Sequence, residues 1–283
     1  MTPLEQLFAG LRDRDYAREG LFVLEGRLVL EKALAAGIAV AAALCVPADA
    51  EEWTGRLPAG TPLQVLPRPE MEQLVGFAFH RGVLALGVRP RSASPAGSDP
   101  KPETGSVALG SDPVLSGSDP RQNAASGGRP RRYLALWQVS DPDNLGALIR
   151  SAAALGFDCV ILGPGCADPL GRKALRSGMG CALSLPLVSV ADIGQLRAAC
   201  SDSLLLAAAL YLVALTPDEL YARLPADRDL VLILGNEGWG LPAEMVAAAD
   251  YAIQIPMANQ VDSLNVGAAG AILMWELTRA SRS

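Results

Sequence analysis

The chain has 283 residues, of which 50% are hydrophobic, and a formal net charge of −6 at pH 7. That length accommodates about two ordinary domains, each with a core of its own. The acidic total argues against a uniformly basic nucleic-acid binder, although a local basic face can coexist with it. No apolar run reaches the ~20 residues that a membrane helix needs, so we expect no membrane partner.

The five cysteines are scattered and form no Cys-x-x-Cys pair. This spacing indicates neither a disulfide framework nor a metal site. The first ten residues contain an acidic residue and no basic segment, which is not typical of a secretory signal. We therefore expect a cytoplasmic protein that holds no metal.

Residues 1–90 alternate short apolar runs with helical patterns, which predicts a small α/β domain. In the helix expected over 26–36, we predict that Leu28, Leu30, Leu34 and Ala35 form the apolar side. A second helix is expected near 69–75. The predicted strands cover 21–24, 41–46, 63–66 and 82–88.

Residues 91–132 lose this periodicity and are rich in Pro, Gly, Ser and Ala. The tetrapeptide Gly-Ser-Asp-Pro occurs three times, starting at positions 97, 110 and 117. Such a composition buries too little apolar surface to offset its ordering entropy, so a flexible linker is predicted. The segment ends in Arg129, Arg131 and Arg132, for which a solvated arm is favoured over a phosphate-binding one.

Residues 133–283 alternate strands with helices, which predicts a parallel sheet covered on both faces. Trp137 and Trp275 are expected in its core. The predicted strands cover 133–139, 159–162, 204–209, 230–234 and 252–255, and the predicted helices 145–155, 169–176, 242–249 and 264–279.

Three loops that follow strands in this second domain combine glycine with polar side chains. Ligands bind at the carboxyl ends of strands in open α/β sheets, so these loops are candidate sites. The first loop runs over 140–146 and leads into a helix that carries Arg150. Asp143 or Asn144 can serve as the helix N-cap. Asn144 and Arg150 also suit contacts to a ribose or a phosphate.

The second loop, Gly235-Asn236-Glu237-Gly238-Trp239-Gly240-Leu241-Pro242, follows a strongly hydrophobic run. Its glycines let the backbone approach a ligand closely. The spacing is not the Gly-x-Gly-x-x-Gly dinucleotide fingerprint, which argues against a nucleotide-linked oxidoreductase. A tight turn accounts for Pro242 but not for Glu237 between glycines.

The third loop joins Ile255-Pro256-Met257 to Ser263-Leu264-Asn265-Val266-Gly267. Ser263 can cap the last helix. Asn265, predicted just inside that helix, is a poor helix former and a good side-chain ligand, which favours a functional role.

Taken together and in this order, the three loops closely resemble the SpoU (TrmH) family of SPOUT methyltransferases. The matching patterns are Asn-x-Gly-x-x-x-Arg, Leu-Gly-Asn-Glu-Gly-x-Gly and Ile-Pro-Met with Ser-Leu-Asn-Val. The resemblance covers residues 133–283. Phe22-Val23-Leu24-Glu25-Gly26 and His80-Arg81-Gly82-Val83-Leu84-Ala85 resemble the accessory RNA-binding domain of the family.

The resemblance implies a trefoil knot, a homodimer whose sites draw on both subunits, and S-adenosyl-L-methionine as cofactor. The residues that it assigns to catalytic or substrate positions are Asn144, Arg150, Glu237, Ser263 and Asn265. It places at cofactor positions Gly235, Ile255, Met257 and Leu264. The chain departs from the family in the long linker and in Gly178 and Gly267, where serine is frequent.

The implied reaction is RNA methylation at a ribose 2′-hydroxyl. We expect Arg150 to clamp the phosphate beside the ribose, and either that phosphate or Glu237 to accept the proton. Asn144 and Asn265 would orient the groups. Large-subunit rRNA is favoured as substrate because of the accessory domain. The alternatives are tRNA, and a knotted dimer that binds RNA without methylating it.

Overall fold

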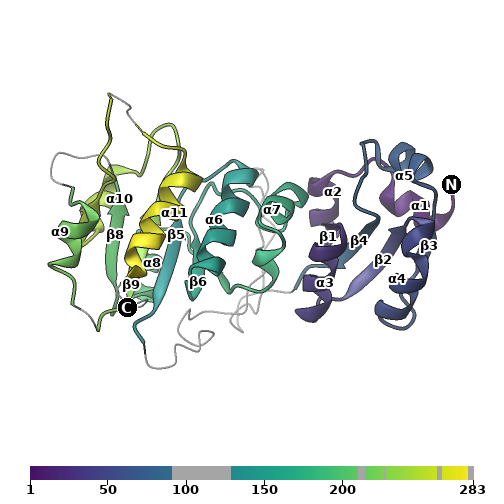
Figure 1. Ribbon diagram of the computed structural model, residues 1–283, viewed down its shortest axis with the longest axis horizontal. Coiled ribbons are helices and arrows are strands. Elements are labelled where there is room, and N and C mark those ends of the chain that lie inside the picture. The colour runs from purple at the N-terminus through teal and green to yellow at the C-terminus, as the bar shows by residue number, and fades with distance from the viewer. Residues whose placement is uncertain (91–128, 210–213, 226, 260–262, 280–283) are drawn as a thin grey trace, which may run out of the picture.

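The computed structural model describes residues 1–90, 129–209, 214–225, 227–259 and 263–279. The predicted linker lies almost wholly outside these described residues. A four-stranded sheet is built from the first 90 residues and a six-stranded sheet from the part that begins at residue 129 (Figure 1). No helix of the described ranges combines the length and the apolar composition required to cross a membrane.

The four-stranded sheet has the order β1-β4-β2-β3. Strand β4 runs antiparallel to both β1 and β2, whereas β3 is parallel to β2. All four predicted strands are confirmed: β1 (Leu21–Glu25), β2 (Val40–Cys45), β3 (Leu63–Val65) and β4 (Val83–Val88). The helices of this domain are α1 (Pro3–Phe8), α2 (Asp13–Arg18), α3 (Arg27–Ala35), α4 (Ala50–Arg56) and α5 (Arg68–Val75), with a 3-10 turn η1 (Pro47–Asp49).

The face that α3 buries differs from the predicted one. Val29, Leu30 and Ala33 are buried, whereas Leu28 is 39% exposed and Ala35 is also exposed. The buried positions follow the i, i+1, i+4 spacing of one helical face. The prediction is confirmed for Leu30, which is buried, and for Leu34, which packs against the core, but it was wrong for Leu28 and Ala35.

The six-stranded sheet is parallel throughout and has the order β10-β8-β9-β5-β6-β7. This confirms the predicted fold class. The strands are β5 (Arg132–Leu136), β6 (Cys159–Leu162), β7 (Leu187–Ser189), β8 (Leu204–Ala208), β9 (Leu230–Leu234) and β10 (Tyr251–Ile253). The helices are α6 (Pro142–Ala154), α7 (Arg172–Ser177), α8 (Ile193–Ala199), α9 (Pro217–Tyr221), α10 (Ala243–Ala248) and α11 (Val266–Leu277), with a 3-10 turn η2 (Cys181–Leu183).

Side chains alternate between the two faces of this sheet, as the pleat requires. Along β5, Leu134 and Leu136 join the core beneath α6, α7 and α11. Tyr133 and Ala135 join the core beneath α8 and α10. Both faces of the sheet are therefore buried, which explains the continuous apolar run over 133–137.

The chain order places the polar loops at one point of the sheet. From β5 the chain builds β6 and β7 on one side, and it then forms β8, β9 and β10 on the other. The carboxyl ends of β5 and β9 are consequently adjacent where the direction of winding reverses. Ligands of open α/β sheets bind in the crevice at such a reversal.

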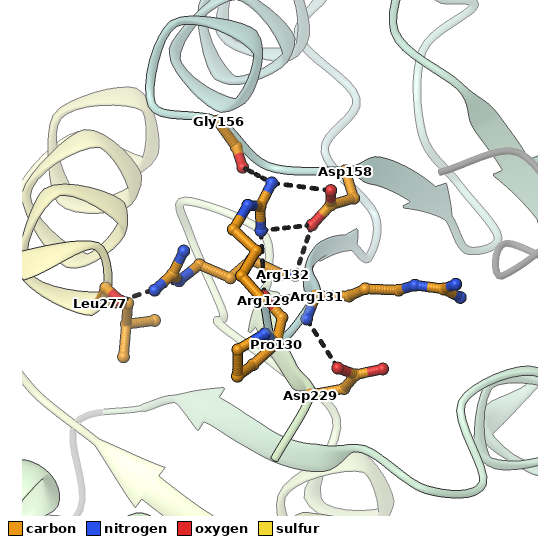
Figure 2. Close-up of polar contacts among 8 residues, drawn as sticks. All are labelled: Arg129, Pro130, Arg131, Arg132, Gly156, Asp158, Asp229 and Leu277. Carbon is orange, nitrogen blue, oxygen red and sulfur yellow. Dashed lines mark hydrogen bonds and ion pairs between the residues drawn. The ribbon is translucent and has the colours of Figure 1, made fainter. Parts of the chain in front are cut away.

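Arginines fasten the start of β5 at the opposite edge of the sheet (Figure 2). The Arg129 guanidinium donates to both carboxylate oxygens of Asp158, at 3.1 and 2.8 Å, and to the Gly156 carbonyl at 3.1 Å. Arg132 donates through Nε to the Leu277 carbonyl at 3.0 Å. Arg129 is exposed to solvent, as a solvated arm requires, but Arg129 and Arg132 both bond to other parts of the protein, which the prediction did not include.

One device recurs at this edge. An aspartate directly before a strand accepts a hydrogen bond from a backbone N–H at the start of the neighbouring strand. Asp158 accepts from the N–H of Arg132 at 2.8 Å, Asp229 from that of Arg131 at 2.6 Å, and Asp250 from that of Leu205 at 2.7 Å. These bonds satisfy backbone donors that the ladder leaves unpaired.

Candidate functional site

Three of the predicted site residues form one chain of hydrogen bonds. Asn144 Nδ2 donates to Glu237 Oε1 at 2.5 Å, and Asn265 Nδ2 donates to Asn144 Oδ1 at 3.0 Å. Asn144 lies in the first turn of α6, Glu237 in the loop after β9, and Asn265 directly before α11. Segments more than 90 residues apart in sequence therefore meet at one place.

The side chain of Asn144 is free for this contact because another residue caps α6. Asp141 accepts hydrogen bonds from the N–H groups of Asp143 and Asn144, at 2.8 and 2.9 Å. The prediction that Asp143 or Asn144 is the N-cap was wrong. With the helix end already satisfied, the amide of Asn144 serves no capping role.

The side chain of Asn265 bonds to three residues. Its Oδ1 accepts from the N–H groups of Gly267 and Ala268, at 2.9 and 3.3 Å, which makes it the N-cap of α11. Its Nδ2 is then directed at Asn144. The helix therefore begins at Val266, two residues later than predicted, and Asn265 takes the capping role that was considered for Ser263.

Glu237 lies at the exposed tip of a closed loop. The backbones of Asn236 and Gly240 bond to each other at 3.1 and 2.9 Å. A Cβ at Gly235 would lie 2.5 Å from the Gly240 carbonyl, and Gly240 has a positive φ of 71°. The glycines at these two positions thus allow the loop to close on itself, which projects the Glu237 carboxylate toward solvent.

A cavity of about 490 Å³ opens beside this loop, at the carboxyl ends of β8, β9 and β10. Its size falls within the ~300–1,000 Å³ that is typical of small-molecule sites. Leu234, Ile253 and Leu273 contribute apolar walls. The structure brings all four predicted cofactor residues to its lining, together with two predicted catalytic residues: Gly235, Ile255, Met257, Leu264, Glu237 and Ser263.

The same cavity is bordered by Trp239, whose side chain is 76% exposed. Its Nε1 donates to Gln138 Oε1 at 3.2 Å. Gln138 has a positive φ of 57° and bonds through its backbone to Asn236 and Pro164. No sequence pattern pointed to Gln138, since a left-handed backbone at a non-glycine residue leaves no compositional signal.

Arg150 is not brought to these residues. It lies on the exposed side of α6 and makes no hydrogen bond or ion pair with any residue of the described ranges. Six residues separate it from Asn144, which corresponds to about 9 Å along a helix. The predicted catalytic set is thus divided: three of its residues are bonded to one another, Ser263 lines the neighbouring cavity, and Arg150 lies apart.

The two departures from the family pattern lie at crowded positions. A Cβ at Gly178 would lie 2.9 Å from the Ala174 carbonyl oxygen and 3.0 Å from that of Gly146. A Cβ at Gly267 would lie 3.0 Å from Asn265 Oδ1. In this backbone a serine at either position would require its neighbours to move.

A second cavity of about 280 Å³ lies beyond the ends of β6 and β7 and includes Cys166. Burial raises the pKa of the Cys166 thiol to about 11. The thiol is therefore protonated at neutral pH and is a poor nucleophile. Nucleophilic cysteine chemistry is not supported at this place.

Comparison with known proteins identifies a matching family and several relatives of this chain. The family model described as "SpoU rRNA Methylase family" matches residues 131–275. A tRNA/rRNA methyltransferase of Mycobacterium tuberculosis is 33% identical over 216 residues, which cover 74% of this chain and 64% of that protein. The 23S rRNA (guanosine(2553)-2′-O)-methyltransferase RlmP of Bacillus subtilis is 36% identical over 150 residues, covering 52% of this chain and 58% of RlmP.

Among solved structures, an AdoMet-bound rRNA methyltransferase from Sinorhizobium meliloti has a TM-score of 0.76 and 23% sequence identity, covering 99% of this chain and 95% of that one. This likeness shows that the two chains share a fold. The chain spans less than two thirds of the length of the mycobacterial and Bacillus relatives. The family model matches more than half of the chain, and on that ground the chain belongs to the SpoU rRNA methylase family.

Proposed function

We propose that the protein is an S-adenosyl-L-methionine-dependent methyltransferase that modifies a ribose 2′-hydroxyl of RNA. The observation that carries the proposal is the bonded group Asn265–Asn144–Glu237 at the border of an apolar cavity. A hydroxyl placed against Glu237 would lie beside any ligand held in that cavity.

The lining of the cavity fits the cofactor. Its walls at Leu234, Ile253 and Ile255 suit an adenine ring and the carbon skeleton of methionine, while Asn236 and Gln254 offer polar groups at the same site. Ligand pockets of this kind combine apolar walls with a few oriented polar groups. When bound, S-adenosyl-L-methionine supplies an electrophilic methyl group.

The protein side chains then have to position one hydroxyl and receive one proton. Glu237 is exposed, carries a carboxylate, and is held by the Asn144 amide at 2.5 Å. We assign Glu237, or the neighbouring RNA phosphate, as the proton acceptor. Asn144 and Asn265 fix the orientation of the carboxylate, and Ser263 lines the same cavity.

Because Arg150 lies apart from the bonded group, we infer that it acts in the site of a second subunit. Helix α11 packs against α6 and consists almost entirely of apolar residues, yet Ile272 is 40% exposed and Trp275 is 52% exposed. Trp275 was predicted to be a core residue, and this was wrong. Exposed apolar side chains on one helix are typical of an interface. We infer a homodimer through α11 in which Arg150 serves the partner's site as a phosphate clamp.

The substrate inferred here is large-subunit rRNA, with tRNA as the alternative. A relative that is 36% identical is named as a 23S rRNA 2′-O-methyltransferase. The four-stranded domain would supply RNA contacts outside the site. The trefoil knot, which the family resemblance implies, remains a prediction for this chain.

Methyl transfer can be tested with radiolabelled S-adenosyl-L-methionine. We expect the purified protein to label large-subunit rRNA more than tRNA, with the label on a ribose oxygen by mass spectrometry of nuclease digests. The Asn144→Ala variant serves as the negative control. Uptake of the cofactor by calorimetry without transfer to either RNA would instead favour a binding protein without catalytic activity.

A mixing experiment tests the shared site. The Arg150→Ala and Asn144→Ala variants are each expected to be inactive. When the two are unfolded and refolded together, half of the dimers are mixed and hold one intact site, so about a quarter of wild-type activity should return. No recovery would place Arg150 in its own subunit's site or remove it from the mechanism.

A further inference from the structure

The small domain contacts α7 directly, although residues 91–128 separate the two in sequence. Figure 1 shows α7 between α6 and the small domain, and the contacts confirm that α7 packs on both β1 and α6. Buried side chains of the two sheets also join one continuous apolar cluster. The small domain is therefore docked on the large one at α7.

One residue of α7, Arg172, is held by the small domain at three points. Its backbone N–H donates to Asp13 Oδ2 at 2.9 Å, and its guanidinium donates to Glu25 Oε2 at 3.3 Å. The guanidinium also stacks over the Phe77 ring at 4.0 Å. All three partners belong to the first 90 residues.

The contact with Asp13 replaces a missing helix cap. Residue Gly171 precedes α7 and offers no side-chain cap. The Asp13 carboxylate instead accepts from the first N–H of the helix, and anions are favoured at that end. The small domain thus satisfies a backbone donor that α7 cannot satisfy from its own sequence.

The contact with Glu25 carries a cost if it is broken. Glu25 is only 6% exposed, and its two oxygens face Arg81 of its own domain at 3.6 Å and Arg172 at 3.3 Å. A buried carboxylate that loses a cationic partner is strongly destabilised. In the docked structure Glu25 therefore depends on Arg172, and without that guanidinium only Arg81 would remain to pair with it.

On its other side, α7 touches the helix that carries Asn144. A Cβ at Gly146 would lie 2.3 Å from the Ala174 carbonyl oxygen, so the two backbones are in direct contact. Lys173 also pairs with Asp143 at 2.9 Å, one residue before Asn144. A displacement of α7 is transmitted to the start of α6, because contacts this close cannot absorb it.

We propose that Arg172 is a positioning residue through which the small domain holds α7 against α6 and so fixes Asn144 in the candidate site. The consequence for catalysis rests on the methyltransferase function proposed above. The structural coupling of the small domain to α6 through α7 does not rest on that function, and it can be measured without RNA or cofactor.

Hydrogen exchange of the full chain, followed by mass spectrometry, measures the coupling. The variants are Arg172→Met, Glu25→Gln and the conservative Arg172→Lys. Arg56→Met is the matched control, because Arg56 also joins a carboxylate, Glu31 at 2.6 Å, to an aromatic ring, but within the small domain.

Loss of the contact between the Arg172 guanidinium and Glu25 should speed exchange in residues 142–150 about fivefold, the size expected for the loss of one hydrogen bond. Arg172→Met and Glu25→Gln should show this, whereas Arg172→Lys and Arg56→Met should match the wild type. Peptides of β4 report whether the small domain stays folded. If Glu25→Gln unfolds it, Arg172→Met decides, because that side chain belongs to the other unit.

The result that overturns the proposal is faster exchange in 172–177 of Arg172→Met with wild-type protection in 142–150. In methylation assays we expect the kcat of Arg172→Met to fall about tenfold, with an unchanged KM for S-adenosyl-L-methionine. Arg172→Lys should recover it. A wild-type protein without methylation would reject the proposed function, while the exchange data would still decide the coupling.

Discussion

The two edges of the six-stranded sheet use polar residues in opposite ways. At the amino edge, Asp158, Asp229 and Asp250 each bond a backbone N–H of the neighbouring strand, and Arg129 is held by Asp158. At the carboxyl edge, Asn144 and Glu237 bond each other in an exposed position. The polar residues of the first edge complete the fold, and those of the second remain available to a ligand.

This difference bears on whether basic residues are interpreted as nucleic-acid contacts or as parts of the fold. From the sequence, a solvated arm was favoured for Arg129, Arg131 and Arg132, with a phosphate-binding arm as the alternative. In the structure, Arg129 and Arg132 are used for internal bonds (Figure 2). Variants at the two edges should consequently separate activity from stability, and the following experiments test that separation.

The largest effect is expected for Asn144→Ala. The methylation rate should fall by about 100-fold, because an oriented hydrogen-bond group at the reacting centre is lost. The melting temperature should stay close to that of the wild type, since Asp141, not Asn144, caps α6. Calorimetry and a rate assay on the same preparation measure both. A large drop in melting temperature would show that the carboxyl edge is also structural.

Asp158→Ala should have the opposite effect, on stability and not on the methylation rate. The change removes the partner of Arg129 and of the Arg132 N–H, and it should lower the free energy of unfolding by about 3 kcal/mol. The rate per folded molecule should remain at the wild-type level. Asp218→Ala is the control, because its ion pair with Arg279 is exposed and should contribute little. Equal stability losses in both variants would contradict the assigned role of the amino edge.

Gly146→Ala tests the contact between α6 and α7. A Cβ there meets the Ala174 carbonyl at 2.3 Å, so we expect a loss of about 2 kcal/mol in denaturant unfolding. In contrast, Gly55 lies in α4 with no atom near its Cβ position. Gly55→Ala should stabilise by up to about 1 kcal/mol. A neutral Gly146→Ala would show that the helices can separate without cost.

The smallest effect concerns pH. Burial raises the pKa of Asp250, but hydrogen bonds from Arg197 and the Leu205 N–H outweigh it and leave that pKa below its ordinary value. A depressed native pKa contributes stability above the unfolded pKa, and this is lost as the pH falls through the folded pKa. Asp250→Asn should therefore cost less than about 1 kcal/mol at neutral pH. Unfolding curves of both proteins should converge in acid; a constant gap would exclude the charge as the cause.

Much of the architecture follows from sequence patterns. The strands over 159–162 and 230–234 match β6 and β9, because fully buried parallel strands have continuous apolar runs. Strand β7 was missed, since three residues at a sheet edge produce no periodicity. Helix α8 was missed as well, although its N-cap residue, Asp192, is a type that signals a helix start in the sequence.

The site was predictable as a set of loops but not as a geometry. Glycine spacing and strand ends identified Asn144, Glu237 and Asn265, which the structure joins. The caps were misassigned, because Asp141 and Asn265 compete with adjacent polar residues of similar capping preference. Neither Gln138 nor Arg172 could be found, since their roles depend on a backbone conformation and on a contact with a distant domain.

The residues on either side of segment 91–128 are held in place by hydrogen bonds. Arg89 bonds the Leu21 carbonyl and Asp168, and Arg129 bonds Asp158. The register of β4 is set by its pairing with β1 and β2, and that of β5 by its pairing with β6 and β9. Insertions, deletions or a genetically placed tag within 91–128 should therefore be tolerated, which makes this segment a practical place to attach a reporter or to divide the gene.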